Sequence, residues 1–484
     1  MHLLTLLLLS SATLIFSGQS TVDLPLHRLL RSAVESGDVM TVSELLAKGA
    51  DAEVKLRNGM NSVMLASLSG SSGVVAVLLS SVPEGETRGR LAETGVLTAI
   101  SQGHAAVLSL LLEAGASPEA ANKHGSTALM LAAFKGRADL VALLLSRGAT
   151  SVNAIDSDTM TALMHAARSG HASAIKQLIA AGAKLSIREK GSRSNALHMA
   201  SSAACLECVT ALLSAGAKPD ERESHKYSAL HFAASVGASD VIDALLSAGA
   251  KPEPKDADGV TPLIYAAAHG FSNATRTLIR GFANTRTLDK EGYTPLVHAS
   301  FAGHLEVVKV ILEEDEKATL EMTDNVSQNT PLLWAVFAGH APVVQVLLAA
   351  GANIEAVNQG DVTPLRLASF SGHVEIIENL IAHGALVDAH NSERNTALHT
   401  ASYSGNEHAV FALLKAGANQ FLKNIGEETP VEAAATSAEH VKAVFFDDAP
   451  PPSTPYVIKP LAQKTFQYLH LPRALGPPKL RDEL

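Results

Sequence analysis

Apolar and polar residues follow a block pattern that recurs about every 33 residues along most of the chain. One part of the block is the stretch "DGVTPLIYAAAHG" at residues 258–270, and the other resembles "LEVVKVIL" at 305–312, with apolar residues at i, i+3 and i+4. Both parts predict short amphipathic helices. The Thr-Pro pair provides a helix cap and a suitable first helical residue, and the closing Gly ends the first helix.

The position of Thr261 in this block defines the register of the whole chain. Its equivalents are Arg28, Asn61, Thr94, Thr127, Thr161, Asn195, Ser228, Thr294, Thr330, Thr363, Thr396 and Thr429. Consecutive positions are 33, 34 or 36 residues apart, so thirteen repeats of one helix pair follow each other. We therefore expect a single array over residues 21–447 instead of three separate domains.

Several repeats carry a motif of known type: "NTALHTAS" (395–402), "GYTPLVHAS" (292–300) and "DVTPLRLAS" (361–369). This motif and its period resemble the ankyrin repeat. The resemblance implies an all-α solenoid of about 13 helix-turn-helix units joined by hairpin-like loops. It also implies a concave face lined by first helices, and a protein partner bound there. The third repeat ("SSVPEGETRGRLAETG") and the ninth ("EEDEKATLEMTDN") depart from the pattern, so we expect softened junctions there.

The two ends of the chain predict an address in the secretory pathway. Residues 3–16 are uncharged and apolar, as in a signal peptide, and we expect cleavage after Ser20; an uncleaved anchor is the alternative. Residues 448–484 form a proline-rich tail. It ends in Arg481, Asp482, Glu483 and Leu484, which resemble a K-D-E-L retention signal read by a retrieval receptor. These features predict residence in the endoplasmic reticulum lumen, without membrane insertion after signal cleavage.

Charge and motifs narrow the classes of function. The formal net charge is -10 without a basic run, which argues against nucleic acid as a partner. No phosphate-binding loop or nucleophile motif is present, so we predict no enzymatic activity and no cofactor. The histidines recur at fixed repeat positions, one repeat apart. We therefore predict that they order loops through hydrogen bonds and hold no metal.

Aromatic residues give the best candidates for partner contacts. Seven residues after the marker, four consecutive repeats carry Phe301, Phe337, Phe370 and Tyr403. An exposed stripe of rings is typical of a protein-binding surface. The alternative is that each ring packs on the neighbouring repeat. At the loop tips we expect further polar contacts from Tyr227, Asp258, Glu291 and Tyr293.

Two other features suggest modification or redox chemistry. Cys205 and Cys208 form the sequence "CLEC" at the start of a second helix, where a reactive thiol, a disulfide or simple packing are all open. Asn273 and Asn325 lie in glycosylation sequons. The leading hypothesis is a lumenal scaffold that binds a protein partner. A thiol-active folding assistant using the two cysteines and a cytosolic ankyrin adaptor are the alternatives.

Overall fold

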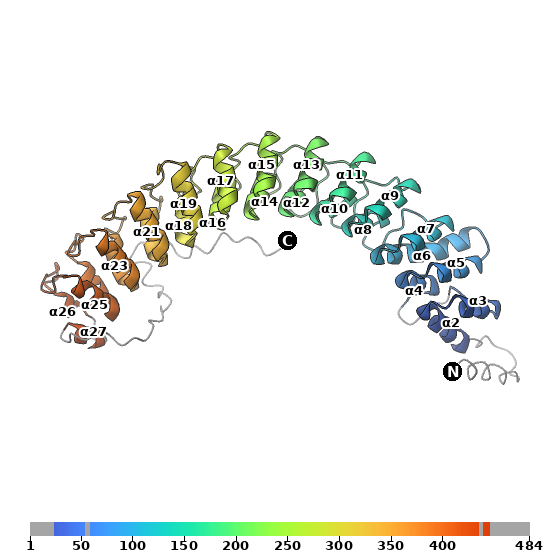
Figure 1. Ribbon diagram of the computed structural model, residues 1–484, viewed down its shortest axis with the longest axis horizontal. Helices are drawn as coiled ribbons and strands as arrows, with labels where there is room; N and C mark the ends of the chain where they lie inside the picture. Colours follow the sequence, from blue (N-terminus) through green and yellow to red (C-terminus); the bar gives the residue numbers. More distant parts are fainter. Residues whose placement is uncertain (1–23, 54–58, 435–438, 446–484) are drawn as a thin grey trace. The chain divides into compact units, whose positions relative to one another are not determined.

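The computed structural model describes residues 24–53, 59–434 and 439–445, and this part of the chain is all-helical (Figure 1). It contains no β-strand, only isolated β-bridges at three hairpin loops. The predicted signal peptide (1–20) and the whole predicted tail (448–484), including Arg481–Leu484, lie outside the described residues. The all-α prediction is confirmed for the rest.

The helices belong to two compact units. Unit 1 runs to Ala166 and includes Lys176–Ala183, and unit 2 comprises Ala167–Ile175 and the residues from Lys184 onward. The division therefore falls within the fifth predicted repeat.

Unit 1 contains α2 (Leu24–Ser36), α3 (Val39–Ala47), α4 (Ser62–Ser69), α5 (Ser72–Ser80), α6 (Glu86–Gln102), α7 (Ala105–Glu113), α8 (Ala128–Phe134) and α9 (Ala138–Ser146). The helices divided between the units are α10 (Ala162–Arg168) and α11 (Ala172–Ala180). Unit 2 contains α12 (Ala196–Ser202), α13 (Leu206–Ser214), α14 (Ala229–Ser235), α15 (Ser239–Ser247), α16 (Pro262–Ala268), α17 (Ser272–Arg280), α18 (Pro295–Ala302), α19 (Leu305–Glu314), α20 (Pro331–Ala338), α21 (Ala341–Ala350), α22 (Pro364–Ser371), α23 (Val374–Ala382), α24 (Ala397–Ser404), α25 (Glu407–Lys415), α26 (Pro430–Ala433) and α27 (Glu439–Val444).

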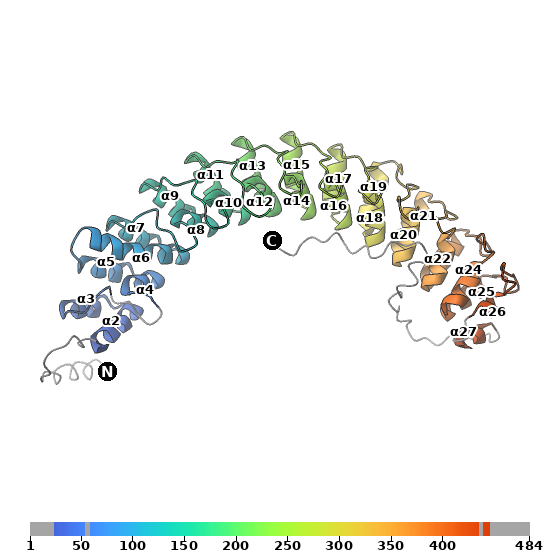
Figure 2. The same cartoon turned by 180° about the vertical axis from the view of Figure 1, so that it is seen from behind.

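These described helices form thirteen pairs in the predicted register. Within unit 2, each first helix packs on the next first helix, as α16 does on α18 and α18 on α20. Second helices pack on second helices in the same way, for example α17 on α19 and α19 on α21 (Figure 2). One continuous apolar core runs between the two rows, and it contains buried residues from successive repeats such as Leu296, Leu332 and Leu365. No repeat closes its own core, so stability comes from stacking.

The ninth repeat shows why this sequence forms these short helices. The Thr294 side chain accepts a hydrogen bond from the Val297 N–H at 3.2 Å, and Pro295 occupies the first helical position. Gly303 ends the helix with φ 76°, a conformation that favours glycine. The His340 ring of the next repeat lies against Gly303, and its Nε2 donates to the Phe301 carbonyl at 3.0 Å.

This contact recurs between other neighbouring repeats. His304 Nε2 donates to the Ala268 carbonyl at 3.0 Å, and His104 Nε2 donates to the Leu68 carbonyl at 3.3 Å. In the twelfth repeat, Asn406 replaces the histidine and donates to the Phe370 carbonyl at 2.6 Å. The prediction that the repeated histidines order loops through hydrogen bonds is confirmed at these positions.

The third repeat departs from the pattern in a specific way. Its first helix, α6, already begins at Glu86, so Thr94 lies inside the helix and donates to the Leu91 carbonyl instead of capping the helix. Gly89 lets this longer helix approach the Gly115 backbone, because a Cβ there would lie 2.9 Å from the Gly115 carbonyl oxygen. The prediction that Thr94 caps this helix is therefore wrong. The additional helical residues before Thr94 stand where other repeats have a hairpin-like loop.

The ninth repeat absorbs its extra residues in a turn after α19. Glu316 and Lys317 take positive φ angles of 52° and 66° in this turn. On the second-helix row, Arg276 of α17 pairs with Glu313 and Glu314 at 3.2 and 2.8 Å. The acidic stretch thus joins two adjacent second helices.

Among the described residues, none of the helices combines the length and the apolar character that crossing a membrane requires.

A buried histidine fastens three of the first helices to the following loop. His231 Nδ1 accepts from the Ser228 N–H, and its Nε2 donates to the Val260 carbonyl at 3.2 Å. His198 and His399 make the equivalent bonds. Each ring is neutral in this arrangement. Burial, which disfavours the charged imidazolium, lowers the pKa of all three, and that of His231 to about 4.

The depressed pKa values predict acid sensitivity. The unfolded chain takes up a proton at each ring as the pH falls below about 6.5, whereas folded His231 stays neutral until about pH 4. The contribution of each neutral ring to the free energy of unfolding is thus complete above about pH 6.5. It is lost on acidification toward pH 4, by up to about 1.4 kcal/mol per pH unit for each ring. Between pH 6.5 and 5, wild type should lose about 1.6 kcal/mol more than His231→Gln in denaturant unfolding followed by circular dichroism. His383→Gln, at an exposed histidine that fastens no first helix to a following loop, is the matched control. Parallel profiles for wild type and His231→Gln would contradict this account.

Candidate partner-binding face

The candidate site is the surface formed by the first helices of unit 2 and the hairpin tips that precede them, here called the first-helix face. In both views this row lies on the inner side of the bend within unit 2 (Figures 1 and 2). The predicted contacts Phe301, Phe337, Phe370 and Tyr403 all lie on these first helices.

A buried carboxylate holds each of three hairpin tips on its first helix. Asp289 accepts from the backbone N–H groups of Glu291 and Tyr293 at 3.1 and 2.8 Å, and from His298 Nε2 of α18 at 2.8 Å. Asp256 accepts in the same way from the backbone N–H groups of Asp258 and Val260 in its tip. It also accepts from the Tyr265 hydroxyl at 3.0 Å. We call this arrangement the carboxylate staple. It fixes the tip because charge-assisted hydrogen bonds in a buried site are strong.

The third staple in unit 2 contains the chain's single tryptophan. Asp324 accepts from the N–H groups of Val326, Ser327 and Asn329 at 2.6–2.9 Å and from Trp334 Nε1 at 3.1 Å. Asp324 and Trp334 are both 1% exposed. The indole is thereby locked beneath the tip that precedes its own helix.

Some repeats have Asn where others have the Asp of the carboxylate staple. The difference correlates with the side chain nine or ten residues later, on the first helix that follows the tip. Asn358 accepts from the Gly360 and Val362 N–H groups, and nine residues after it stands Leu367, which has no side-chain donor. Asn391 and Asn424 are likewise followed at that distance by Thr400 and Ala433. An amide offers one acceptor oxygen for the tip, whereas a carboxylate offers a second oxygen for a ring donor. Among these Asp and Asn residues, the carboxylate occurs where a donor ring is available, whereas Glu223 holds its tip without a ring donor at Phe232.

Unit 1 contains one staple of the same kind. Asp156 accepts from the Asp158 and Met160 N–H groups at 3.0 and 2.9 Å and from His165 Nε2 at 2.8 Å. Burial raises the pKa of Asp156, but the bonds from His165 and the backbone outweigh it, so the pKa lies below the usual value.

The tips of unit 2 are also joined to each other. The Ala257 N–H donates to the His225 carbonyl, Lys290 N–H to Asp258, and Asn325 N–H to Glu291, at 3.0, 3.2 and 3.3 Å. Each tip is therefore held both by its own helix and by its neighbour, which gives a preformed edge.

Behind this edge lies an aromatic group, here called the Trp334 cluster, formed by Tyr293, Val297, Trp334, Phe301 and Phe337. Phe301 and Phe337 stack with centroids 6.4 Å apart and planes at 15°, and the Trp334 ring meets both edge-on at 5.5 and 5.9 Å. Both Phe rings remain half-buried. They pack on their neighbours, as the alternative interpretation expects, and they also keep part of their surface exposed.

The rest of the stripe differs in exposure. Phe370 is half-buried, and Tyr403 is 59% exposed. A binding role for the four rings stays a prediction.

The expectation for Tyr293 is wrong. Its ring is 1% exposed and packs edge-on against Trp334 and His298, with centroids 5.7 and 5.6 Å away. Tyr293 immediately precedes the marker Thr294, and its side chain lies beneath the tip. Val260 and Val362, the equivalent residues of two other repeats, are also buried. Tyr293 therefore supports the tip from below and offers no loop contact, whereas Asp258 and Glu291 are exposed, as predicted.

A second aromatic group, the Tyr227 cluster, comprises Tyr227, His231, Phe232 and Tyr265. Tyr227 is half-buried and meets Phe232 and Tyr265 edge-on at 5.8 and 5.9 Å. The Tyr265 hydroxyl lies 3.0 Å from both the Tyr227 hydroxyl and Asp256. Burial raises the pKa of both phenols, so they remain neutral donors at neutral pH.

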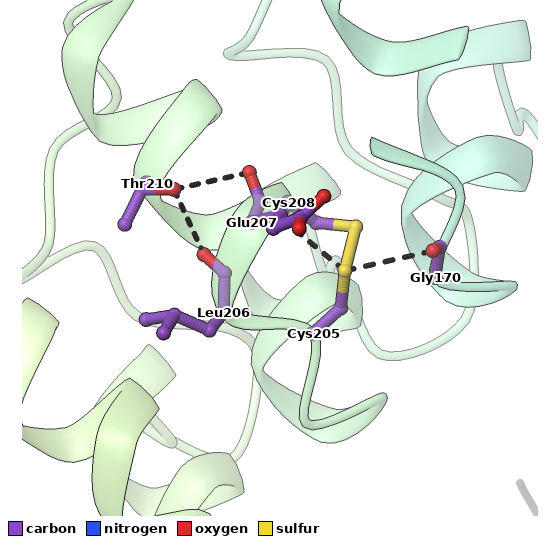
Figure 3. Close-up of a disulfide and its surroundings, with 6 residues drawn as sticks. All are labelled: Gly170, Cys205, Leu206, Glu207, Cys208 and Thr210. Carbon is purple, nitrogen blue, oxygen red and sulfur yellow. Dashed lines mark hydrogen bonds between the residues drawn. A yellow bond between two sulfur atoms is a disulfide. The ribbon is translucent and has the colours of Figure 1, made fainter. Parts of the chain in front are cut away.

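The two cysteines form a disulfide, which settles the question that the sequence leaves open (Figure 3). Cys205 caps α13, and its Sγ accepts from the Cys208 N–H at 3.2 Å and lies 3.6 Å from the Gly170 carbonyl oxygen. Cys208 is fully buried and Cys205 is half-buried, so a thiolate from solution could reach the bridge at Cys205 alone.

The structure also shows the exposure of the two glycosylation sequons and the spacing of side chains that could bind a metal ion. Asn273 on α17 and Asn325 at a hairpin tip are both exposed. In the part of the chain that the structure describes, no three His, Cys, Asp or Glu side chains come close enough to hold a metal ion.

Comparison with known proteins identifies the family. A family model described as "Ankyrin repeats (3 copies)" matches residues 84–156, 149–223, 230–324, 284–358, 316–391, 332–424 and 367–447. These matches span more than half of the chain. The chain belongs to the ankyrin repeat family. Such repeats are typically modules for protein–protein interaction.

Solved ankyrin repeat domains are similar to parts of this chain. The ankyrin repeat domain of Bcl-3, a member of the IkappaB protein family, is 27% identical over 45% of this chain and 97% of its own, with a TM-score of 0.42. The human ASB11 ankyrin repeat domain is 26% identical over 46% of this chain and 96% of its own, with a TM-score of 0.41. No curated protein matches the sequence.

Sequence reasoning missed the residues that build the face from below. Asp289, Asp324 and Trp334 carry the staples and the aromatic cluster but stand outside the ankyrin motif itself. A usable signal was present: an Asp five or six residues before the marker is followed nine or ten residues later by His, Tyr or Trp.

The staple predicts a graded loss of stability. Asp289→Ala leaves two tip N–H groups and His298 without an acceptor and should lower the free energy of unfolding by about 3 kcal/mol. Asp289→Asn keeps the tip bonds, as Asn358 does, and should cost about 1 kcal/mol. Asp258→Ala removes an exposed ion pair with Lys290 and should cost well under 1 kcal/mol. Denaturant unfolding followed by Trp334 fluorescence measures all three, and equal losses would refute the staple.

Proposed function

We propose that this chain is a non-enzymatic scaffold of the endoplasmic reticulum lumen that holds a protein partner on the first-helix face of unit 2. The observation that carries the binding half is the Phe301–Phe337 stack, half-exposed beside tips that are already fixed by Asp289 and Asp324. Rigid rings at the centre of a surface supply contact area at low entropic cost.

Several features support the lumenal half of the proposal. A disulfide between Cys205 and Cys208 suits an oxidising compartment. The sequon residues Asn273 and Asn325 are exposed and thus accessible to glycan. The apolar stretch at residues 3–16 and the RDEL end have the form of an entry signal and a retention signal.

A thiol-active folding assistant is the second candidate, and the disulfide is the observation in its favour. Exchange at Cys205 would have to release the thiolate of Cys208, which is fully buried. An apolar site raises a thiol's pKa and so makes this thiolate a poor leaving group. The scaffold therefore remains the stronger proposal, and the cytosolic adaptor has no comparable observation to support it.

An epitope tag inserted after Ser453, upstream of the last four residues, tests the location. The tagged chain should stay in the endoplasmic reticulum and shift in gel mobility on deglycosylation, and the chain without Arg481–Leu484 should be secreted. An Asn273→Gln/Asn325→Gln variant should show no shift, which assigns the glycan. Recovery of the tagged chain in the cytosol, unshifted, would contradict the lumenal proposal.

The same tagged chain tests the binding face. Cross-linking in intact cells should recover partner complexes about fivefold less with Phe301→Ala/Phe337→Ala, because central aromatic contacts usually contribute more than 1 kcal/mol. Phe282→Ala is the matched control, since Phe282 is 90% exposed and lies beyond the end of α17. Equal recovery from all three chains would remove the first-helix face from the proposal.

A further inference from the structure

The Tyr227 and Trp334 clusters share an unusual composition: half-exposed rings surrounded by carboxylates. Asp289, Glu291 and Asp324 lie around the Trp334 cluster, and their negative charges contribute, after burial, to raising the pKa of Tyr293. Glu223, Asp256 and Asp258 lie around the Tyr227 cluster and act on Tyr227 in the same way. Each cluster therefore combines π faces with a negative potential.

Three basic side chains of these tips are already engaged, and Lys226, beside Tyr227, is exposed. Lys290 Nζ pairs with Asp258 at 3.2 Å, Lys255 Nζ donates to the Leu288 carbonyl at 3.1 Å, and Arg222 donates to the Lys255 carbonyl at 2.9 Å. Glu291 is exposed, and its carboxylate has no ion-pair partner among the described residues. The negative potential near the Trp334 cluster is thus only partly compensated within the protein.

The eleventh repeat provides an internal contrast. Phe370 occupies the same register as Phe301 and Phe337, but Arg366 stands one helical turn before it on α22. Arg366 donates to the Asp361 carbonyl and is 8% exposed, so this helix carries a buried positive charge that α18 and α20 lack. The acidic and aromatic combination of the seventh to tenth repeats therefore does not continue into the eleventh.

We propose that the first-helix face binds an extended basic segment of its protein partner, with one Lys or Arg side chain on the Tyr227 cluster and another on the Trp334 cluster. This inference rests on the proposed function and specifies the partner's chemistry. A cation over an aromatic face is attracted by the ring quadrupole, and adjacent carboxylates add to that attraction. The formal net charge of the whole chain, -10, also favours approach of a basic partner.

The repeat geometry sets the spacing of the two basic residues. The markers of the clusters, Ser228 and Thr294, are two repeats apart. Packed helices lie about 8–10 Å apart, so the clusters are about 20 Å apart. An extended segment advances about 3.3 Å per residue, which places the two basic side chains about six residues apart.

The test uses the full-length chain and a 12-residue Gly/Ser peptide with two arginines six residues apart. Trp334, the single tryptophan, reports binding by its fluorescence. A peptide with glutamine at both arginine positions and one with adjacent arginines serve as peptide controls. The spaced arginine peptide should bind at least about fivefold more tightly than either control, and added salt should weaken its binding.

Variants locate the contact. Phe337→Leu keeps the apolar packing but removes the π face, so it should weaken the arginine peptide about threefold while the unfolding midpoint stays close to wild type. Glu291→Gln removes one exposed charge and should weaken binding about two- to fivefold. The matched controls are Phe282→Leu, beyond the end of α17, and Glu375→Gln on α23 of the second-helix row, and both should bind as wild type does.

The outcomes separate this inference from the proposed function. If the arginine and glutamine peptides bind equally and Phe337→Leu changes neither, the cationic chemistry is wrong, and the scaffold proposal still stands on its cross-linking test. If the peptide binds only after removal of residues 449–484, the face is occupied by the chain's own tail, and a partner in trans is wrong. That segment contains Lys459, Lys464, Arg473, Lys479 and Arg481 and no acidic residue before Asp482.

Discussion

Stacking between neighbouring repeats is the constraint on which this protein depends. A pair of short helices cannot enclose an apolar core, so each pair is stable only with a neighbour on its apolar side. Polar contacts repeat at the same interval and set the register of stacking. His340 reaches back to the Phe301 carbonyl, His231 reaches forward to the Val260 carbonyl, and the Asn325 N–H donates to the Glu291 carbonyl. The polar groups therefore belong to the same nearest-neighbour system as the core.

The candidate site is a consequence of this arrangement. Because Asp289 and Asp324 hold their tips on α18 and α20, the rings behind the tips have fixed positions before any partner arrives. A preformed surface loses little conformational entropy on binding. The same carboxylates have a second effect, since they give the aromatic clusters a negative potential. The residues that hold the tips are thus the same residues that surround the proposed binding surface.

The sequence predicts the repeats well because the motif encodes local geometry. Thr caps, Pro at the first helical position and the closing Gly all act within one repeat, and the observed helices follow them except at Thr94, where α6 starts earlier. Tyr293 shows where such reasoning stops. Its position in the loop indicates exposure, but whether a ring lies above or beneath the tip depends on packing against Trp334, which is 41 positions further on by number and one repeat away. The cysteine pairing was open for the same reason, because side-chain approach is a tertiary property.

The central claim is that the first-helix face of unit 2 is the surface that holds a partner. Hydrogen–deuterium exchange of the full-length chain, alone and in complex with its cross-linked partner, tests this claim most directly. The account predicts slower exchange at the tips 256–260, 289–293 and 324–329 and in α18 and α20, with α17, α19 and α21 unchanged. Slower exchange confined to the second-helix row, or absent from unit 2, would contradict it.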